Sequence, residues 1–185
     1  ELEIQNLLYD IAIQERQIEQ LGKGDTDALE AIYRRAKSAV YGLALSIVRN
    51  REDAQDIMQD SFLKVYRAAP RYQAKGKPMA WILRITRNLA LDRLRAKSAT
   101  ELPLEAEKIK NPQGDLSQDT LDRMILNTAL DRLSEEERQI VILRSVEQFK
   151  HKEIAGILEI PLGTALSKYH RALSKLRKIL EEDET

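Results

Sequence analysis

The stretch Glu153-Ile-Ala-Gly-Ile-Leu-Glu-Ile-Pro-Leu-Gly-Thr164 is typical of a helix-turn-helix, and it decides how the rest of the chain is interpreted. A short helix is predicted to begin near His151 or Lys152 and to end before Pro161, because a residue before proline is pushed into an extended conformation. Its inner face is predicted at Ile154, Ala155 and Leu158. The next helix is predicted to begin with a cap at Gly163 or Thr164.

The second helix of this motif has a predicted inner face and a predicted outer face. The inner face is expected at Ala165, Tyr169, Ala172, Leu173 and Leu176, which recur with helical spacing. The outer residues near the helix start, where a recognition helix meets base edges, are Leu166, Ser167, His170 and Arg171. Phosphate contacts are expected from Lys168, Lys175, Arg177 and Lys178. A plain helical hairpin with a basic surface is the alternative.

Upstream, the run from Asp53 to Tyr66 is an acidic amphipathic helix. Its apolar stripe is predicted at Ala54, Ile57, Met58, Ser61, Phe62, Val65 and Tyr66. The residues left on the other face are Asp53, Asp56, Gln59, Asp60, Leu63 and Lys64. An exposed leucine among acids and a glutamine indicates a protein-docking site with a small apolar centre and a charged rim. Ordinary solvated surface is the alternative.

A basic helix is predicted next, from Met79 to Arg95. Its inward residues are expected to be Ile82, Ile85 and Leu89, with Trp81 expected in the core rather than stacked on a base. Another face carries Arg84, Arg87, Asn88, Leu91 and Arg95, and arginine with asparagine suits contacts with an unpaired nucleic-acid strand. The preceding loop, with Tyr72, Lys75 and Lys77, either cradles a flipped base or simply connects helices.

Composition favours an all-α fold, and the spacing of polar residues predicts a protein that is not an enzyme. The chain has 185 residues, 43% of them hydrophobic, with 7 glycines and 5 prolines that mostly lie between periodic segments. With no cysteine, thiolate metal sites and disulfides are excluded. No catalytic or metal-ligand spacing appears, so we expect a binding protein without a cofactor or metal. No apolar run reaches the roughly 18 residues of a membrane span and no signal peptide is visible, which predicts a cytoplasmic protein.

Charge is segregated along the chain although the net charge is +0. Residues 71–97 carry eight Arg/Lys and one Asp, a balance of +7, and residues 150–178 carry seven Arg/Lys and two Glu, a balance of +5. Residues 1–30 carry eight acids and two cations, a balance of −6. Two separate basic segments indicate contact with nucleic acid, and a merely solvated surface is the alternative.

These segments predict two small helical domains joined by a flexible linker. The predicted divisions are an acidic helical extension at 1–21, a first domain at 22–96, a linker at 97–119 and a helix-turn-helix domain at 120–185. Asp25 or Thr26 is the predicted cap of the long helix that follows residue 25. Ser134 and Glu137 are predicted to form a capping box at a later helix start.

Four collinear motifs resemble the extracytoplasmic-function (ECF) class of bacterial sigma factors. The stretch Asp53–Tyr66 resembles the helix of that class that binds core RNA polymerase, and Trp81–Arg95 resembles its minus-ten recognition helix. The stretch Leu130–Val141 and the helix-turn-helix quoted above resemble its minus-thirty-five domain. The resemblance covers roughly residues 22–96 and 121–180.

The resemblance implies three sets of contacts. Core polymerase would be bound by Asp53, Asp56, Gln59, Asp60 and Leu63. Melted minus-ten DNA would be held by Tyr72, Lys75, Lys77, Arg84, Arg87 and Asn88. Duplex minus-thirty-five DNA would be read by Thr164, Leu166, Ser167, Lys168, His170, Arg171 and Lys175. It also implies an anti-sigma factor as a further partner and a free protein that is a monomer.

The sequence also departs from the family pattern. Leu166 stands where the family often has Lys, Ala165 where it often has Val, and Glu159 where it often has Gly. Leu166 removes a phosphate or base contact that is usual in the family, so the resemblance predicts an ECF-type sigma factor but not its promoter sequence. The competing hypotheses are a stand-alone helix-turn-helix regulator and a helical adaptor that binds only proteins. The acidic helix favours the sigma factor over the regulator, and the two basic clusters disfavour the adaptor.

Overall fold

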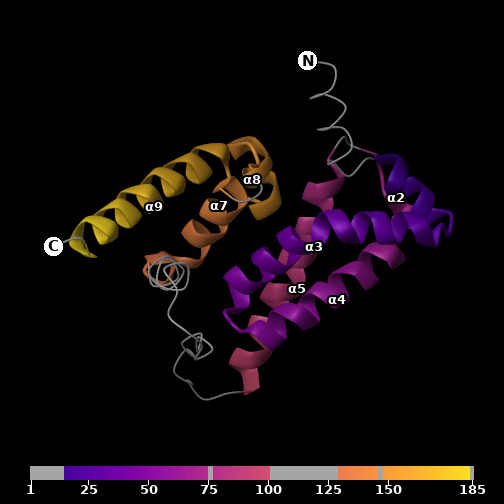
Figure 1. Ribbon diagram of the computed structural model, residues 1–185, viewed down its shortest axis with the longest axis horizontal. Coiled ribbons are helices and arrows are strands. Elements are labelled where there is room, and N and C mark those ends of the chain that lie inside the picture. The colour runs from indigo at the N-terminus through magenta and orange to yellow at the C-terminus, as the bar shows by residue number, and fades with distance from the viewer. Residues whose placement is uncertain (1–14, 75–76, 101–128, 146–147, 184–185) are drawn as a thin grey trace, which may run out of the picture. The chain divides into compact units, whose positions relative to one another are not determined.

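The computed structural model describes residues 15–74, 77–100, 129–145 and 148–183, and in these ranges the ordered backbone is helical with short turns and no strand (Figure 1). The chain divides into two units, residues 1–100 and residues 101–185, each with its own core. The predicted all-α class with two helical domains is confirmed. Most of the predicted linker, and residues 1–14 of the predicted helical extension at 1–21, lie outside the described residues.

The first unit is a helical bundle. Its elements are α2 (Glu15–Gly22), α3 (Thr26–Val48), α4 (Arg51–Ala68), a 3₁₀ turn η1 (Ala69–Arg71) and α5 (Pro78–Thr100). Helices α3, α4 and α5 pack against one another in pairs and run side by side in Figure 1. The core between them is fully buried and includes Ile32, Val40, Leu43, Ile57, Val65, Ile82 and Leu83. Burial of this aliphatic surface is the main force that holds the three helices together.

Side-chain caps set where the helices of this unit begin. Asp25 accepts from the backbone N–H of Asp27 at 3.0 Å and of Ala28 at 3.4 Å, so the prediction of Asp25 as the cap of α3 is confirmed. Arg49 then leaves the helix with φ 54°, and Asn50 Oδ1 accepts from the N–H of Asp53 at 2.9 Å. The link between α3 and α4 is thus only Arg49 and Asn50, which leaves the two helices in direct contact.

Helix α2 belongs to the core of the first unit. Ile18 and Leu21 are buried, and α2 packs on α3 and on η1. A Cβ on Gly22 would lie 2.9 Å from the carbonyl oxygen of Ala69, so only glycine permits this contact. The predicted boundary after residue 21 therefore runs through a helix. At the other end, α5 continues to Thr100, five residues beyond the predicted Arg95, because nothing in Ala96–Thr100 interrupts it.

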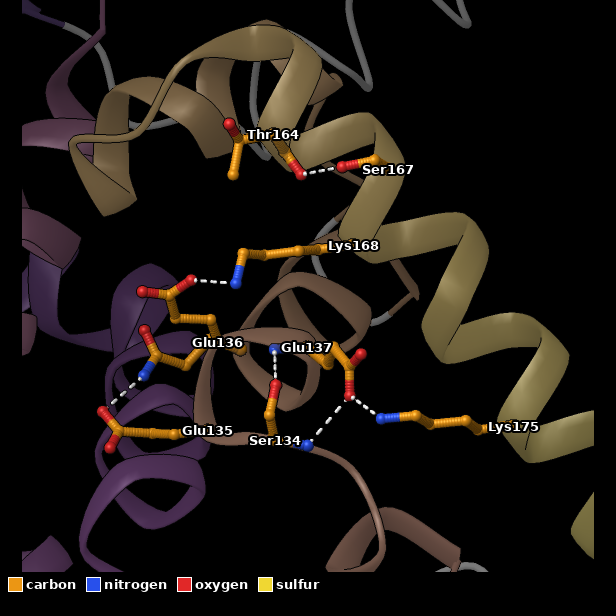
Figure 2. A network of polar contacts seen from close by, with 9 residues as sticks. Ser134, Glu135, Glu136, Glu137, Thr164, Ser167, Lys168 and Lys175 are labelled. Atoms are coloured by element: carbon orange, nitrogen blue, oxygen red, sulfur yellow. Dashed lines mark hydrogen bonds and ion pairs between the residues drawn. The ribbon is translucent and has the colours of Figure 1, made fainter.

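The second unit is built from α7 (Glu135–Ser145), α8 (His151–Leu158) and α9 (Leu162–Asp183). Helix α9 packs on both α7 and α8. The predicted capping box is confirmed: Ser134 N–H donates to Glu137 Oε2 at 2.9 Å, and Glu137 N–H donates to Ser134 Oγ at 3.3 Å (Figure 2). The predicted start of α8 at His151 is also confirmed, and Glu153 accepts there from the N–H of Lys150.

The turn between α8 and α9 differs from its prediction. Helix α8 ends because Glu159 adopts a left-handed conformation, φ 57° and ψ 40°, with its N–H bonded to the carbonyl of Ala155. Helix α9 begins at Leu162, and the N–H of Ala165 donates to the carbonyl of Pro161 at 3.0 Å. The predicted cap at Gly163 or Thr164 is wrong, because both already lie inside the first turn of α9.

Candidate protein-docking and nucleic-acid interfaces

Helix α4 presents an exposed face opposite its buried stripe. Four predicted residues lie on it, and we call them the docking face: Asp56, Gln59, Asp60 and Leu63. Leu63 is 54% exposed, and with the acids and the glutamine around it, it forms a small apolar centre with a charged rim. The sequence places Tyr66 on the buried stripe, but its side chain is 43% exposed and adds an aromatic group to the surface of α4.

Asp53 does not belong to the docking face. It is buried beside α5, where it accepts from Arg93 Nη1 at 2.9 Å and from Lys97 Nζ at 2.5 Å. Asp56 is exposed and lies 3.7 Å from the same arginine. The prediction of a polymerase contact through Asp53 assumed an exposed side chain, and that assumption is wrong. A carboxylate with two cationic partners ties the start of α4 to the end of α5.

Tyr33 on α3 is a surface residue that the sequence analysis did not single out. Its side chain is 39% exposed, and its ring meets Phe62 edge to face, with centroids 4.8 Å apart at 61°. Lys37 Nζ lies 5.9 Å from the centre of the same ring. Phe62 is itself buried next to Leu63, so the surface near the docking face rests on a fixed aromatic pair. Helical periodicity alone does not reveal this contact between helices.

Helix α5 exposes the predicted polar residues of its basic face. Arg84 and Asn88 are exposed, while Arg87 is half-buried. The Nε of Arg87 is buried and has no hydrogen-bond partner among the described residues. Thr86 points the other way, with its hydroxyl donating to the carbonyl of Ile82 at 3.2 Å. The helix thus separates a buried side from a side that presents guanidinium and amide groups.

The loop before α5 is anchored by two aromatic rings. Tyr72 and Trp81 have ring centroids 4.7 Å apart with a tilt of 57°, and the Tyr72 hydroxyl donates to Glu15 Oε1 at 3.2 Å. Trp81 is predicted in the core, but it is only half-buried. Its ring packs on this tyrosine at the edge of the unit. Lys77 is exposed, and Lys75 lies outside the described residues. The loop is therefore fixed at one end by α2.

Two lysines predicted to contact phosphates are instead held within the second unit. Lys168 Nζ lies 2.7 Å from Glu136 Oε2, and Lys175 Nζ lies 2.8 Å from Glu137 Oε2 (Figure 2). Burial alone would raise the pKa of Glu137, but hydrogen bonds from Lys175 and Ser134 outweigh it and hold that pKa below its usual value. These pairs fix α9 on α7.

The outer side of α9 carries the remaining predicted DNA-binding residues. Ser167, His170 and Arg171 are exposed, and Thr164 and Leu166 are half-buried. Ser167 Oγ donates to the carbonyl of Thr164 at 3.0 Å, so its hydroxyl proton is already used inside the helix. Leu173 is 39% exposed, so its predicted inward position is wrong. Arg177 and Lys178 follow on the same helix and are also exposed.

His151, the first residue of α8, packs on α9. Its ring lies 4.8 Å from that of Tyr169, which in turn lies 5.9 Å from the ring of His170. Burial, and then the positive charges of Arg144 and His170, lower the pKa of His151. His151 is half-buried and packs on Tyr169, whereas the side chain of His170 is exposed.

Among the described residues, no group of three or more His, Cys, Asp or Glu is arranged to hold a metal ion. The helices described there include none that is both long and apolar enough to cross a membrane.

Comparisons with known proteins agree with this architecture. The Sigma-70 region 2 family matches residues 32–100, and the Sigma-70, region 4 family matches residues 123–176. The ECF RNA polymerase sigma factor SigW of Bacillus subtilis is 29% identical over 181 residues, which cover 90% of this chain and 96% of SigW. The RNA polymerase sigma factor CarQ of Myxococcus xanthus is 32% identical over 168 residues, which cover 89% of this chain and 96% of CarQ.

A solved structure supports the fold. The sigma factor RpoE in complex with the anti-sigma factor NepR from Bartonella quintana superposes with a TM-score of 0.67 at 22% identity, over 82% of this chain and 96% of that chain. The stand-alone regulator is not favoured, because the matches extend over both domains. The chain belongs to the extracytoplasmic-function family of RNA polymerase sigma factors, non-enzymatic initiation factors that bind core polymerase and direct transcription from promoters.

Proposed function

We propose that three surfaces of this sigma factor divide the work of initiation. The docking face of α4 binds core RNA polymerase. The basic face of α5, with Tyr72 and Lys77, holds unpaired minus-ten DNA. The outer side of α9 reads duplex minus-thirty-five DNA through Thr164, Leu166, Ser167, His170 and Arg171. Lys168 and Lys175 are positioning residues here, because carboxylates of α7 hold their ammonium groups.

The observation that carries the docking assignment is the exposure of Leu63. A leucine with 54% of its surface in water contributes nothing to the fold on that side, and its neighbours on the helix are acids and a glutamine. Burial of that exposed part against a partner is worth about 1 kcal/mol, roughly half of the 1.5–3 kcal/mol for a whole leucine. An acidic rim in addition favours a partner surface that is basic.

The test is a titration of core RNA polymerase with the variant Asp60→Arg plus Leu63→Ala, read by fluorescence anisotropy of a labelled chain. We expect an affinity at least tenfold weaker, from about 1 kcal/mol of lost apolar contact and a reversed charge on the rim. The matched control is Glu30→Arg, also a charge reversal at an exposed helical position of the first unit. Equal affinities for the two variants would refute the assignment.

The basic face of α5 is supported by the buried and unpartnered Nε of Arg87. A buried N–H without a hydrogen-bond partner carries a desolvation cost, which a nucleic-acid acceptor would offset if the side chain turned toward it. The test is promoter opening by the polymerase complex, followed by permanganate reactivity of unpaired thymines. We expect Arg87→Ala to reduce opening while polymerase binding stays unchanged. Normal opening by this variant would contradict the role.

We further propose a domain organisation and a set of partners. The polymerase-binding and minus-ten domain is assigned to residues 22–96 with the addition of α2, the connecting segment to residues up to 119, and the duplex-reading domain to 120–185. The free protein is proposed to be a cytoplasmic monomer that an anti-sigma factor holds inactive, by analogy with the complex of RpoE and NepR. Light scattering of the free chain tests the monomer, and co-purification from its native host tests the anti-sigma factor.

A further inference from the structure

The start of α9 places leucine side chains among the polar groups that can read a base edge. Lys168 is turned to Glu136, and the hydroxyl proton of Ser167 is bonded to the carbonyl of Thr164. Beside Thr164 and Ser167, the surface of the first two turns presents apolar groups: Leu162 is 44% exposed, Leu166 is half-exposed, and Gly163 has no side chain. This part of the helix therefore faces its ligand with leucine side chains.

Gly163 adds a second observation. A Cβ at this position would meet no protein atom within 4 Å, so the packing of the unit does not require glycine there. Glycine without a packing reason is found where a ligand approaches the backbone closely. The backbone at the start of α9 is thus open to close approach.

The charges around this surface indicate which ligand. The exposed cations Arg171, Arg177 and Lys178 follow on the same helix, and an anionic polymer complements them. In the major groove of DNA, hydrogen-bonding edges dominate, and the one apolar group is the C5 methyl of thymine. An apolar patch at the tip of a recognition helix thus matches thymine and no other base.

We propose that Leu166, with Leu162 beside it, determines promoter specificity by packing on the methyl group of a thymine in the minus-thirty-five duplex. This inference rests on the proposed role of α9 as the duplex reader. In this proposal Leu166 recognises its base through apolar contact, whereas Arg171 binds DNA through hydrogen bonds and charge.

The experiment removes only the methyl group. The chain bound to core polymerase is used to select duplexes from a library randomised upstream of the start site. Each thymine of the selected duplex is then replaced in turn by deoxyuridine, which keeps every hydrogen-bonding group. We expect one position at which the replacement weakens binding about fourfold, as burial of one methyl group predicts. For Leu166→Ala we expect the ratio of the affinity for the thymine duplex to the affinity for the deoxyuridine duplex to fall to about one.

Leu173→Ala is the matched control, because it removes an exposed leucine of α9 two turns further from the tip. It should keep the fourfold ratio. The proposal is overturned if no deoxyuridine replacement affects the unaltered protein, or if Leu166→Ala keeps the discrimination. The first of these outcomes does not depend on the folding of any variant. Selection of no sequence at all would overturn the duplex-reading role of α9 as well.

Discussion

Replacement of Asp53 by asparagine should destabilise the first unit without any direct effect on polymerase contact. The carboxylate is 11% exposed and accepts from Arg93 at 2.9 Å and from Lys97 at 2.5 Å. Asparagine keeps the shape but loses the negative charge, and only one of its two terminal atoms can accept, so the two cations share one neutral acceptor in place of two carboxylate oxygens. Because the two cations are 32% and 43% exposed and regain water, we expect a loss of about 1–2 kcal/mol, below that for a fully buried pair.

Urea unfolding followed by tryptophan fluorescence measures this loss in the intact chain. Trp81 is the only tryptophan, so its emission reports on the first unit alone. With a urea dependence of about 2 kcal/mol per molar, the midpoint should fall by about 0.5 to 1 M. The control is Asp56→Asn, whose carboxylate is 61% exposed and 3.7 Å from Arg93, and whose midpoint should barely change. Equal midpoints for the two variants would refute the reasoning.

Three further predictions concern the second unit. Glu159→Gly should stabilise α8 by about 1 kcal/mol, because glycine adopts φ 57° without strain; slower hydrogen exchange in α8, absent in Glu159→Ala, is the expected result. The pKa of Glu137 is lowered in the folded protein, so its ionised carboxylate adds stability that is complete above the unfolded pKa of about 4.3 and is lost as the pH falls through the folded pKa. Glu137→Gln should remove this part of the pH dependence of hydrogen exchange in α7. An unchanged pH profile of exchange would contradict the prediction. Arg171→Ala should weaken duplex binding by about 1–3 kcal/mol if it reads a base, whereas Lys168→Ala should leave the salt dependence of binding nearly unchanged; the reverse ranking in a salt titration would contradict the assignment.

Local signals in the sequence were sufficient for much of the fold. Helical spacing predicts the buried stripe of α4, and the caps at Asp25 and Ser134 follow from residue types that bond their own backbone two or three positions on. In these bonds the donor and the acceptor are two or three residues apart, so a short stretch of sequence is enough to predict them. The same reasoning extends to the start of α8 at His151.

The errors at Asp53 and Lys168 arise because the partner is distant in the chain. Asp53 is assigned to an exposed face by periodicity, but its cations stand 40 and 44 positions later. Lys168 likewise resembles a phosphate contact until α7 brings Glu136 to it. Long charged side chains reach far enough to cross between helices, so helical spacing alone does not determine whether they point to solvent. Their contacts depend on tertiary packing, which no local pattern contains.

The contact between Gly22 and Ala69 also bears on synthesis of the protein at the ribosome. Helix α2 packs on a segment that emerges 47 residues later (69 − 22), which at bacterial elongation speeds is roughly a few seconds. During that interval Ile18 and Leu21 have no η1 to cover them, although both are buried in the finished unit. A nascent-chain chaperone would find its apolar target in α2 during those seconds, and the emergence of Ala69 would end its access.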